Sequence, residues 1–279
     1  MTLHTYRKVG GVAVPAPIGA TPAAVVSAFL DADAASTQSA RRKLGVPFRS
    51  VHEFGTVDIT GVADATAVMQ AAHDSGELIY YPAGKYKFST LTIPRGGIIG
   101  DGSATQLLTT DTGSGNTITY NGTLIWDGQP RFRDFYFAHA AGSGQTKAGG
   151  YGIKITGSTP TPPDCGLFSG LHFRYLPNFI DIDGCGGWII DRCNFMFFGS
   201  GVAIRIANTA HEDAGDQGIT NCHFYQGGTA IFQRNAGGLR ITANKLHNVA
   251  FGYRLDINAS TSDLLVTGNS FEHCATAAI

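Results

Sequence analysis

The sequence has 279 residues, of which 43% are apolar and only 15% are charged. Its 20 Lys and Arg residues nearly balance its 21 Asp and Glu residues, so it has neither the basic surface typical of nucleic-acid binding nor a polybasic membrane patch. Its 37 glycines exceed the average usage of about 7% without a collagen period. This composition favours an all-β repeat with many tight turns.

Residues 1–20 are predicted to be an irregular N-terminal arm, because glycines and prolines interrupt them. The opening MTLHTYRKVGG contains no long apolar run, and no secretory signal peptide is expected. If the protein works outside the cell, it must leave the cell by a route other than secretion through a signal peptide. Release inside a virus particle is one such route.

Residues 21–50 are predicted to form a neck helix and a linker. Thr21 is a suitable N-cap with Pro22 in the first turn, alanines continue the helix, and basic residues 41–43 stand near its C-terminal end before Gly45. An ordinary surface helix is the alternative interpretation. The length of the segment favours a neck that joins the arm to the next domain.

Residues 51–107 are predicted to hold a short strand (His52–Val57), an amphipathic helix (Asp64–His73) and then short strands separated by glycine turns. Asp64 is the expected N-cap, and Gly76 is expected to end the helix. The apolar stripe of the helix is spaced i, i+3, i+4, i+7 and consists of Ala65, Val68, Met69 and Ala72. The strand signals that follow are Leu78 to Tyr81, Tyr86, Phe88, Leu91, Ile93 and Ile98-Ile99.

Four motifs of residues 51–107 occur in a recognisable order: F-G-x-V, D-A-T-A-V-M-Q-A-A, G-E-L-I-Y-Y-P-A-G-K-Y and I-I-G-D-G. This order resembles the first segment of the pectate-lyase-like right-handed parallel β-helices of bacteriophage tailspikes and some polysaccharide-degrading enzymes. Residues 29–46, FLDADAASTQSARRKLGV, look like a linker common in phage tail fibres and spikes. The Gly-Asp-Gly-x-x-Asp-Asp run usual before the helix is reduced here to residues 59–64.

The resemblance implies an all-β fold: a right-handed parallel β-helix, or solenoid, with a small capping helix, an N-terminal arm and a neck helix. Residues 108–279 would then be the parallel β-helix coils. It further implies a homotrimer that is fixed to a phage tail or baseplate protein through its N-terminal region. Such a protein acts from the virion tail on a host cell-surface polysaccharide, capsule or O-antigen. No cofactor, no metal, no nucleic acid and no membrane insertion are expected.

From Phe132 onward an apolar pattern recurs, at intervals of 36, 22, 29, 22 and 25 residues. Repeats of this length with a fixed apolar column indicate a solenoid. The column positions are Phe137, Phe173, Phe195, Phe224, Leu246 and Phe271. A second column lies two residues earlier: Phe135, Leu171, Cys193, Cys222, Asn244 and Asn269.

The second column predicts how its side chains contact one another. In parallel in-register strands each side chain lies over its equivalent one strand spacing away, so Asn244 over Asn269 would form a hydrogen-bonded ladder. Cys193 over Cys222 would pack as buried thiols, with a redox pair or metal ligands as the alternative. The five cysteines include no C-x-x-C pair, which favours thiols over a disulfide framework. They are Cys165, Cys185, Cys193, Cys222 and Cys274.

A second strand follows in each repeat, with alternating residues that point inward. The inward residues are Ile180, Ile182, Ile204, Ile206, Leu255 and Ile257. Residues 138–165 and 207–217 are longer intervals, expected to project as loops from one face. By this register the sequence stops in the middle of a coil, so we expect either a fragment of a longer protein or an end that a partner covers.

The outward positions of the second strand carry charges that stacking would gather on one face. Hydrolysis of a polysaccharide needs two carboxylates, whereas elimination from a uronate needs a base such as Arg or Lys. The candidate catalytic residues are Asp181, Asp183, Arg205, Arg234, Arg254 and Asp256. The alternative is that these residues only form cross-strand salt bridges on a solvated face.

Aromatic residues add candidates for substrate binding, since sugar rings stack on aromatic faces. Packing between the subunits of a trimer is the alternative role for Tyr175, Trp188, Phe197, Phe198, Tyr225 and Phe232. The candidate substrate-binding residues are Trp188, Tyr225, Glu212 and Asp213. The predicted function is a phage tailspike that binds and depolymerises a host polysaccharide, with a non-catalytic adhesive spike and a free-standing bacterial polysaccharide lyase as alternatives. The active site could also lie outside this chain.

Overall fold

The structure, a computed structural model, has two units, Met1–Pro47 and Phe48–Ile279. It describes residues 6–9, 12–15, 48–121, 130–144, 147–156, 166–207, 217–234, 238–256 and 264–275. In the first unit β1 (Tyr6–Val9) and β2 (Val12–Pro15) form an antiparallel pair. The prediction of an irregular arm is therefore wrong here, because two short Val-containing runs around Gly-Gly favour a hairpin. The predicted neck helix lies outside the described residues.

The second unit consists almost entirely of short parallel strands with a few helical turns. Its helical elements are η1 (Val51–Phe54), α3 (Thr66–Asp74) and η2 (Gly142–Gly144). Its first strands are β3 (Arg49–Ser50), β4 (Thr60–Asp64), β5 (Leu78–Tyr80), β6 (Gly84–Phe88), β7 (Leu91–Ile93), β8 (Gly97–Thr109), β9 (Ile118–Tyr120), β10 (Arg131–His139), β11 (Ile153–Thr156) and β12 (Leu167–Ser169). The remaining strands are β13 (His172–Arg174), β14 (Ile180–Asp183), β15 (Ile189–Asp191), β16 (Asn194–Met196), β17 (Val202–Ala207), β18 (Gln217–Thr220), β19 (His223–Arg234), β20 (Leu239–Thr242), β21 (Lys245–Asp256), β22 (Leu265–Thr267) and β23 (Ser270–Glu272).

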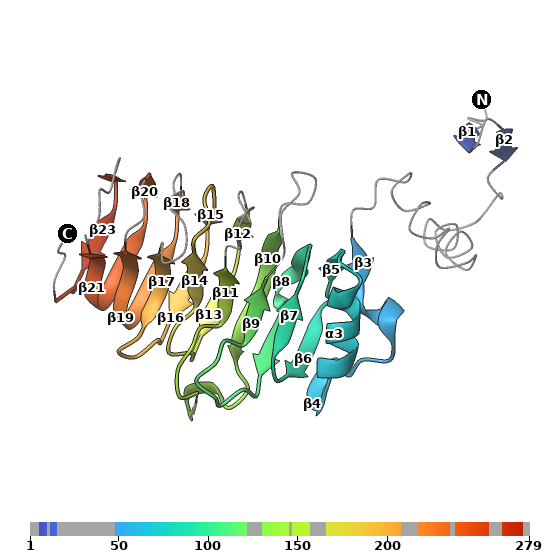
Figure 1. The fold of residues 1–279 in the computed structure, drawn as a ribbon, viewed down its shortest axis with the longest axis horizontal. Helices are drawn as coiled ribbons and strands as arrows, with labels where there is room; N and C mark the ends of the chain where they lie inside the picture. The colour runs from blue at the N-terminus through green and yellow to red at the C-terminus, as the bar shows by residue number, and fades with distance from the viewer. Residues whose placement is uncertain are drawn as a thin grey trace. The chain divides into compact units, whose positions relative to one another are not determined.

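These strands form three parallel stacks, so that each turn of the chain lies directly on the previous one (Figure 1). Stack 1 runs through β6, β8, β10, β13, β16, β19, β21 and β23. Stack 2 runs through β7, β9, β11, β14, β17 and the second halves of β19 and β21. Stack 3 runs through β3, β5, the first halves of β8 and β10, then β12, β15, β18, β20 and β22.

The predicted apolar column is confirmed in stack 1. Phe137, Phe173, Phe195, Phe224, Leu246 and Phe271 are register partners in that order, and the column continues backward to Leu107 and Tyr86. Neighbouring rings stack on one another: the Phe195 centroid lies 5.3 Å from that of Phe173 and 5.0 Å from that of Phe224. Stack 1 thus contributes to the core a continuous column of apolar side chains, most of them aromatic rings.

The predicted asparagine ladder is also present. The Asn244 side chain donates to Asn269 Oδ1 over 3.0 Å and accepts from the backbone N–H of Cys222 over 2.8 Å. The thiols of Cys193 and Cys222 are buried and donate to nearby carbonyl oxygens. Burial raises the pKa of Cys193 well above its usual value. These contacts support the packing interpretation of the two cysteines.

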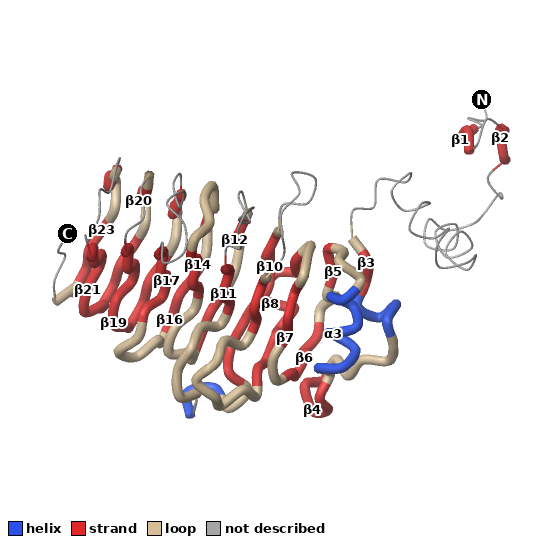
Figure 2. Tube along the Cα trace, viewed as in Figure 1, coloured by secondary structure: helices blue, strands red, loops and turns tan. Residues whose placement is uncertain are grey.

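A short helix covers the first coil (Figure 2). Helix α3 packs against η1, β5 and β7 and buries Ala65, Met69 and Ala72, as the spacing predicts. It begins one residue later than expected: Ala65 is the N-cap, and Asp64 Oδ1 instead accepts from the Thr66 N–H over 2.7 Å. The predicted strand over His52–Val57 is wrong, because Ser50 and Glu53 form a capping box that nucleates η1.

The long interval 138–165 is not a single loop. Strand β11 divides it, so its first part joins stack 1 to stack 2 and its second part joins stack 2 to stack 3. Residues 208–216 likewise join stack 2 to stack 3, between β17 and β18. The corner between the C-terminal ends of the stack 2 strands and stack 3 is therefore the one that residues 157–165 and 208–216 connect, and both segments lie outside the described residues.

Candidate active site

The two candidate aspartates lie on the outward face of stack 2, next to this corner. Register places Lys154 of β11 and Arg205 of β17 on either side of Asp181 of β14. Asp183 is the last residue of β14, on the same side of the strand as Asp181. Two carboxylates and two cations from three consecutive coils therefore converge, and we call Lys154, Asp181, Asp183 and Arg205 the carboxylate cluster.

A single guanidinium connects both carboxylates of the cluster. Arg205 Nη1 donates to Asp181 Oδ1 over 2.7 Å and lies 3.6 Å from Asp183 Oδ2. The sum of these distances, about 6.3 Å, is the upper limit on the separation of the two oxygens, which is below the roughly 6.5 to 9.5 Å spacing of the carboxylates in inverting glycosidases. Lys154 Nζ approaches Asp181 Oδ2 at 3.4 Å from the other side.

Burial differs along the cluster and shapes its protonation. The side chain of Asp181 is only 1% exposed, and its surroundings raise its pKa: burial acts most strongly, while Arg205 and Lys154 oppose it. Burial by itself would lower the pKa of Arg205, but the carboxylates of Asp181 and Asp183 and the Tyr151 hydroxyl together raise it. The cluster therefore holds a carboxyl group with a raised pKa beside a permanently charged guanidinium.

The other charged candidates lie further along the same face but form separate contacts. Arg234 pairs with Asp256 of the next coil at 3.6 Å, with both side chains more than 40% exposed. Arg254 lies over the ring of Phe232 at 5.4 Å. Phe232 separates Arg254 from Arg205 in the register, so the two arginines are two coils apart. Cross-strand ion pairs thus form at two places on this face, in the carboxylate cluster and between Arg234 and Asp256.

The aromatic candidates do not join this cluster. Trp188 was expected to be exposed, but its side chain is fully buried against Phe168, with ring centroids 5.2 Å apart. Gly166 makes room for it, since a Cβ at that position would lie 2.2 Å from the Trp188 ring. Phe198 is buried too. Tyr225 lies in stack 1, where it contacts Phe197 and His247. Glu212 and Asp213 lie outside the described residues.

Two residues near the cluster carried no signal in the sequence analysis. Lys154 belongs to β11, a strand within residues 138–165, which were expected to project as a loop. Tyr151 lies just before β11, and Asp181, Arg205 and Asp183 all act electrostatically on its hydroxyl. Recognition of the inward Ile153 and Ile155 as one more pair of the second-strand pattern would have identified both.

Comparisons with known proteins agree with this fold. Residues 151–279 match the family model described as right-handed β-helix region. A search of curated protein sequences found no match. Among the described residues no helix is long and apolar enough to cross a membrane.

Similar solved structures include a phage protein and polysaccharide-active enzymes. ORF18 of Geobacillus virus E2 aligns with 97% of this chain at 15% identity and a TM-score of 0.49, and the chain covers 66% of that protein. The family 28 exopolygalacturonase of Yersinia enterocolitica aligns with 80% of the chain at 13% identity and a TM-score of 0.41, and 58% of the enzyme is covered. The A-module of the mannuronan C-5 epimerase AlgE6 of Azotobacter vinelandii aligns with 80% at 11% identity and a TM-score of 0.28, and 99% of the module is covered.

At these levels of identity the activities of the neighbours do not transfer to this chain. The strand register and the family-model match define the architecture directly. From Phe48 onward the described residues fold as a right-handed parallel β-helix with one small capping helix.

Proposed function

We propose that this chain is part of a phage tailspike that binds and hydrolyses a host cell-surface polysaccharide, with Asp181 and Asp183 as the paired carboxylates. The proposal rests on one observation above all: both carboxylates reach the same guanidinium nitrogen, on an outward strand face beside the corner where connecting segments leave. The spike role rests on the resemblance of residues 51–107 and 29–46 to phage proteins. Trimer formation and attachment through the N-terminal region belong to the same proposal.

Each carboxylate would have a distinct part in hydrolysis. Asp181, whose pKa is raised, would donate a proton to the leaving oxygen as the glycosidic bond breaks. The Asp183 carboxylate would bond to the sugar carbon to give a glycosyl ester, which water then hydrolyses, with the Asp181 carboxylate taking a proton from that water. Arg205 would hold both groups in place. Elimination with Arg205 as the base is disfavoured, because its neighbours raise its already high pKa and the guanidinium keeps its proton.

The second candidate is an adhesive spike that binds glycan without cleavage. The near-complete burial of Asp181 between Lys154 and Arg205 favours it, since buried ion pairs are also common structural features. In that case the cluster stabilises stack 2, and the glycan binds elsewhere on the surface.

Mass spectrometry of the soluble products released from host polysaccharide distinguishes these candidates. We expect fragments that have gained water, whereas fragments formed without water would indicate a lyase. Glycan binding without any fragments would indicate the adhesive spike. Neither fragments nor binding would contradict the proposed function.

The aspartates are tested by Asp181→Asn and Asp183→Asn, singly and together. We expect each to lower kcat by at least about 100-fold, because a positioned proton donor or carboxylate contributes about 10² to 10⁴ to the rate. Asp134→Asn is the matched control, since Asp134 is an exposed aspartate that pairs with Arg133 at 3.5 Å. Undiminished turnover in the double variant would show that the carboxylate cluster takes no part in the reaction.

A further inference from the structure

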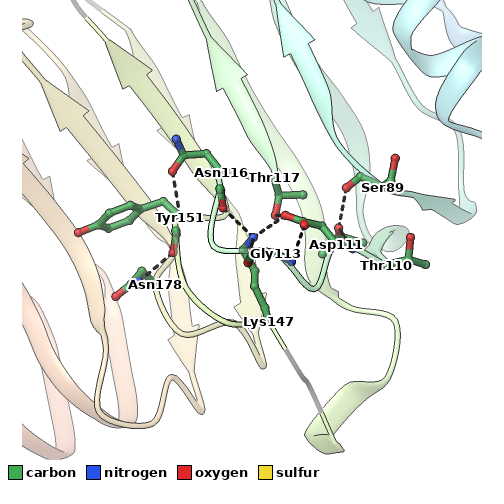
Figure 3. Close-up of polar contacts among 12 residues, drawn as sticks. Ser89, Thr110, Asp111, Gly113, Asn116, Thr117, Lys147, Tyr151 and Asn178 are labelled. Atoms are coloured by element: carbon green, nitrogen blue, oxygen red, sulfur yellow. Dashed lines mark hydrogen bonds and ion pairs between the residues drawn. The ribbon is translucent and has the colours of Figure 1, made fainter.

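Lys147 is a buried lysine outside the carboxylate cluster. Its side chain is 0% exposed, forms an ion pair with Asp111, and donates to the carbonyl oxygens of Gly115 over 2.8 Å and Gly113 over 3.2 Å (Figure 3). A buried ammonium group is tolerated only when it is paired and hydrogen-bonded. We call this arrangement of Lys147 with residues 111–115 the lysine clip.

The lysine clip holds the segment on which Tyr151 depends. Asp111 Oδ1 accepts from the Gly113 N–H over 2.9 Å, which closes the turn around the ammonium group. Just beyond the turn, Asn116 Oδ1 accepts from the Tyr151 N–H over 3.1 Å, and the Thr117 N–H donates to the Tyr151 carbonyl over 2.9 Å (Figure 3). Both backbone polar groups of Tyr151 are therefore bonded to the segment that Lys147 fixes.

Close backbone packing supports the same arrangement. Gly150, with φ +68°, lies so close to the neighbouring coil that an added Cβ would be 1.8 Å from the Gly115 carbonyl oxygen. Only glycine fits this position. The clip, Gly150 and Tyr151 thus form one tightly packed unit.

The other side of Tyr151 is tied to the strands of the carboxylate cluster. The Asn178 side chain donates to the Gly150 carbonyl over 2.8 Å and accepts from the Val202 N–H over 2.8 Å. The Asn178 carbonyl accepts from the Gly152 N–H over 3.0 Å. Asn178 lies just before β14, which carries Asp181, and Val202 begins β17, which carries Arg205.

The hydroxyl of Tyr151 has the protonation state of a donor. Burial raises its pKa, the negative charges of Asp181 and Asp183 raise it further, and only Arg205 opposes them. Among the described residues no side chain or backbone group accepts a hydrogen bond from this hydroxyl. In Figure 3 the Tyr151 ring points away from Lys147. The phenol of Tyr151 therefore keeps its proton, and Asn178 ties the backbone beside it to the strands that carry Asp181 and Arg205.

We propose that Tyr151 is a further substrate-binding residue of the carboxylate cluster, donating a hydrogen bond to a sugar oxygen, and that the lysine clip is the device that positions it. This inference rests on the proposed function. It adds one residue that contacts substrate and one positioning residue, Lys147, which acts only through Tyr151.

A double-mutant cycle tests the inference in the intact 279-residue chain. Tyr151→Phe and Lys147→Met should each weaken kcat/KM, or glycan affinity if no cleavage occurs, by about tenfold, which is the loss of one hydrogen bond. In the double variant the loss should again be about tenfold rather than about a hundredfold, because the clip acts through Tyr151. Tyr80→Phe and Lys85→Met, in earlier coils, are the matched controls. Both should leave kcat/KM and glycan affinity unchanged.

Hydrogen exchange provides a readout that does not depend on activity. Lys147→Met should lower the amide protection of residues 111–117 and 148–152 while leaving residues 217–256 unchanged. Unchanged protection of the first two segments would overturn the role of the clip. An active wild type with an unaffected Tyr151→Phe variant would overturn the role of Tyr151 alone, whereas a wild type that neither binds nor cleaves glycan would overturn the proposed function and this inference together.

Discussion

At the scale of single residues, Asp58 shows how one carboxylate organises an exposed turn. It accepts hydrogen bonds from the N–H groups of Thr60, Val62 and Ala63, at 2.9, 2.8 and 2.6 Å, and from the Thr60 hydroxyl at 2.7 Å. These bonds, led by the one from the Thr60 hydroxyl, lower the pKa of Asp58 from 3.8 to about 2. The bonds of this turn therefore favour the charged form of Asp58.

Asp58→Asn should flatten the acid dependence of stability. Above the unfolded pKa of 3.8 the ionised Asp58 contributes its full stabilisation, and this contribution disappears as the pH falls through about 2. Melting temperatures measured at pH 5, 4, 3 and 2 should therefore fall less steeply for Asp58→Asn than for the wild type. Equal slopes for the wild type and Asp58→Asn would contradict the role of Asp58.

At the scale of elements, burial changes along the apolar column of stack 1. Phe195 is fully buried between two stacked rings, whereas Phe271, in the same column, is 40% exposed in β23. Both positions have the same residue type, strand direction and register. We therefore attribute any difference between the contributions of Phe195 and Phe271 to the free energy of unfolding to their difference in burial.

The pair Phe195→Ala and Phe271→Ala measures this difference. Phe195→Ala should lower the free energy of unfolding by about 3 to 5 kcal/mol, because it removes a buried ring and leaves a cavity. Phe271→Ala should cost clearly less, because part of that ring already contacts water. Denaturant unfolding monitored by circular dichroism provides both values, and similar costs would contradict the burial argument.

At the scale of the whole molecule, the strands of each described coil pair with those of the coils directly before and after it. Stability in such a solenoid is a sum of coil and interface contributions, and opening can begin at one end. The thiols of Cys193, Cys222 and Cys274 lie at successive distances along the axis, and Cys274 is the most accessible of the three.

Thiol labelling followed by peptide mass spectrometry should therefore proceed in order. Cys274 should react first, and Cys222 and Cys193, each 1% exposed, should follow only as the coils open. The variant Cys274→Ala should leave the rates at the two buried thiols unchanged. Simultaneous labelling of all three would indicate global rather than progressive opening.

The sequence predicted the repeating parts of this fold well. A column such as Phe137 to Phe271 is visible because every coil places the same residue type at the same register position. Features that depend on one local contact were missed. Ser50 and Glu53 form a capping box, and residues 51–54 therefore form η1 where a strand was expected.

The candidate site was only partly predictable for the same reason. Asp181, Asp183 and Arg205 follow from strand alternation, and the structure brings them together. The burial of Trp188 depends on the space left by Gly166, which lies elsewhere in the sequence. The spacing of Trp188 in the repeats does not indicate that this residue is buried. Tyr151 is placed by Lys147, Asp111 and Asn116, which lie in connections of unequal length where no repeat exists.

The strict register of the three stacks gives the molecule an evolutionary freedom. Because each coil repeats the path of the coil before it, the gain or loss of one whole coil would displace all later residues by about 4.8 Å along the axis and keep their outward direction. Length and surface chemistry can then change separately. A duplicated coil would lengthen the molecule while the carboxylate cluster, built from three consecutive coils, remained intact.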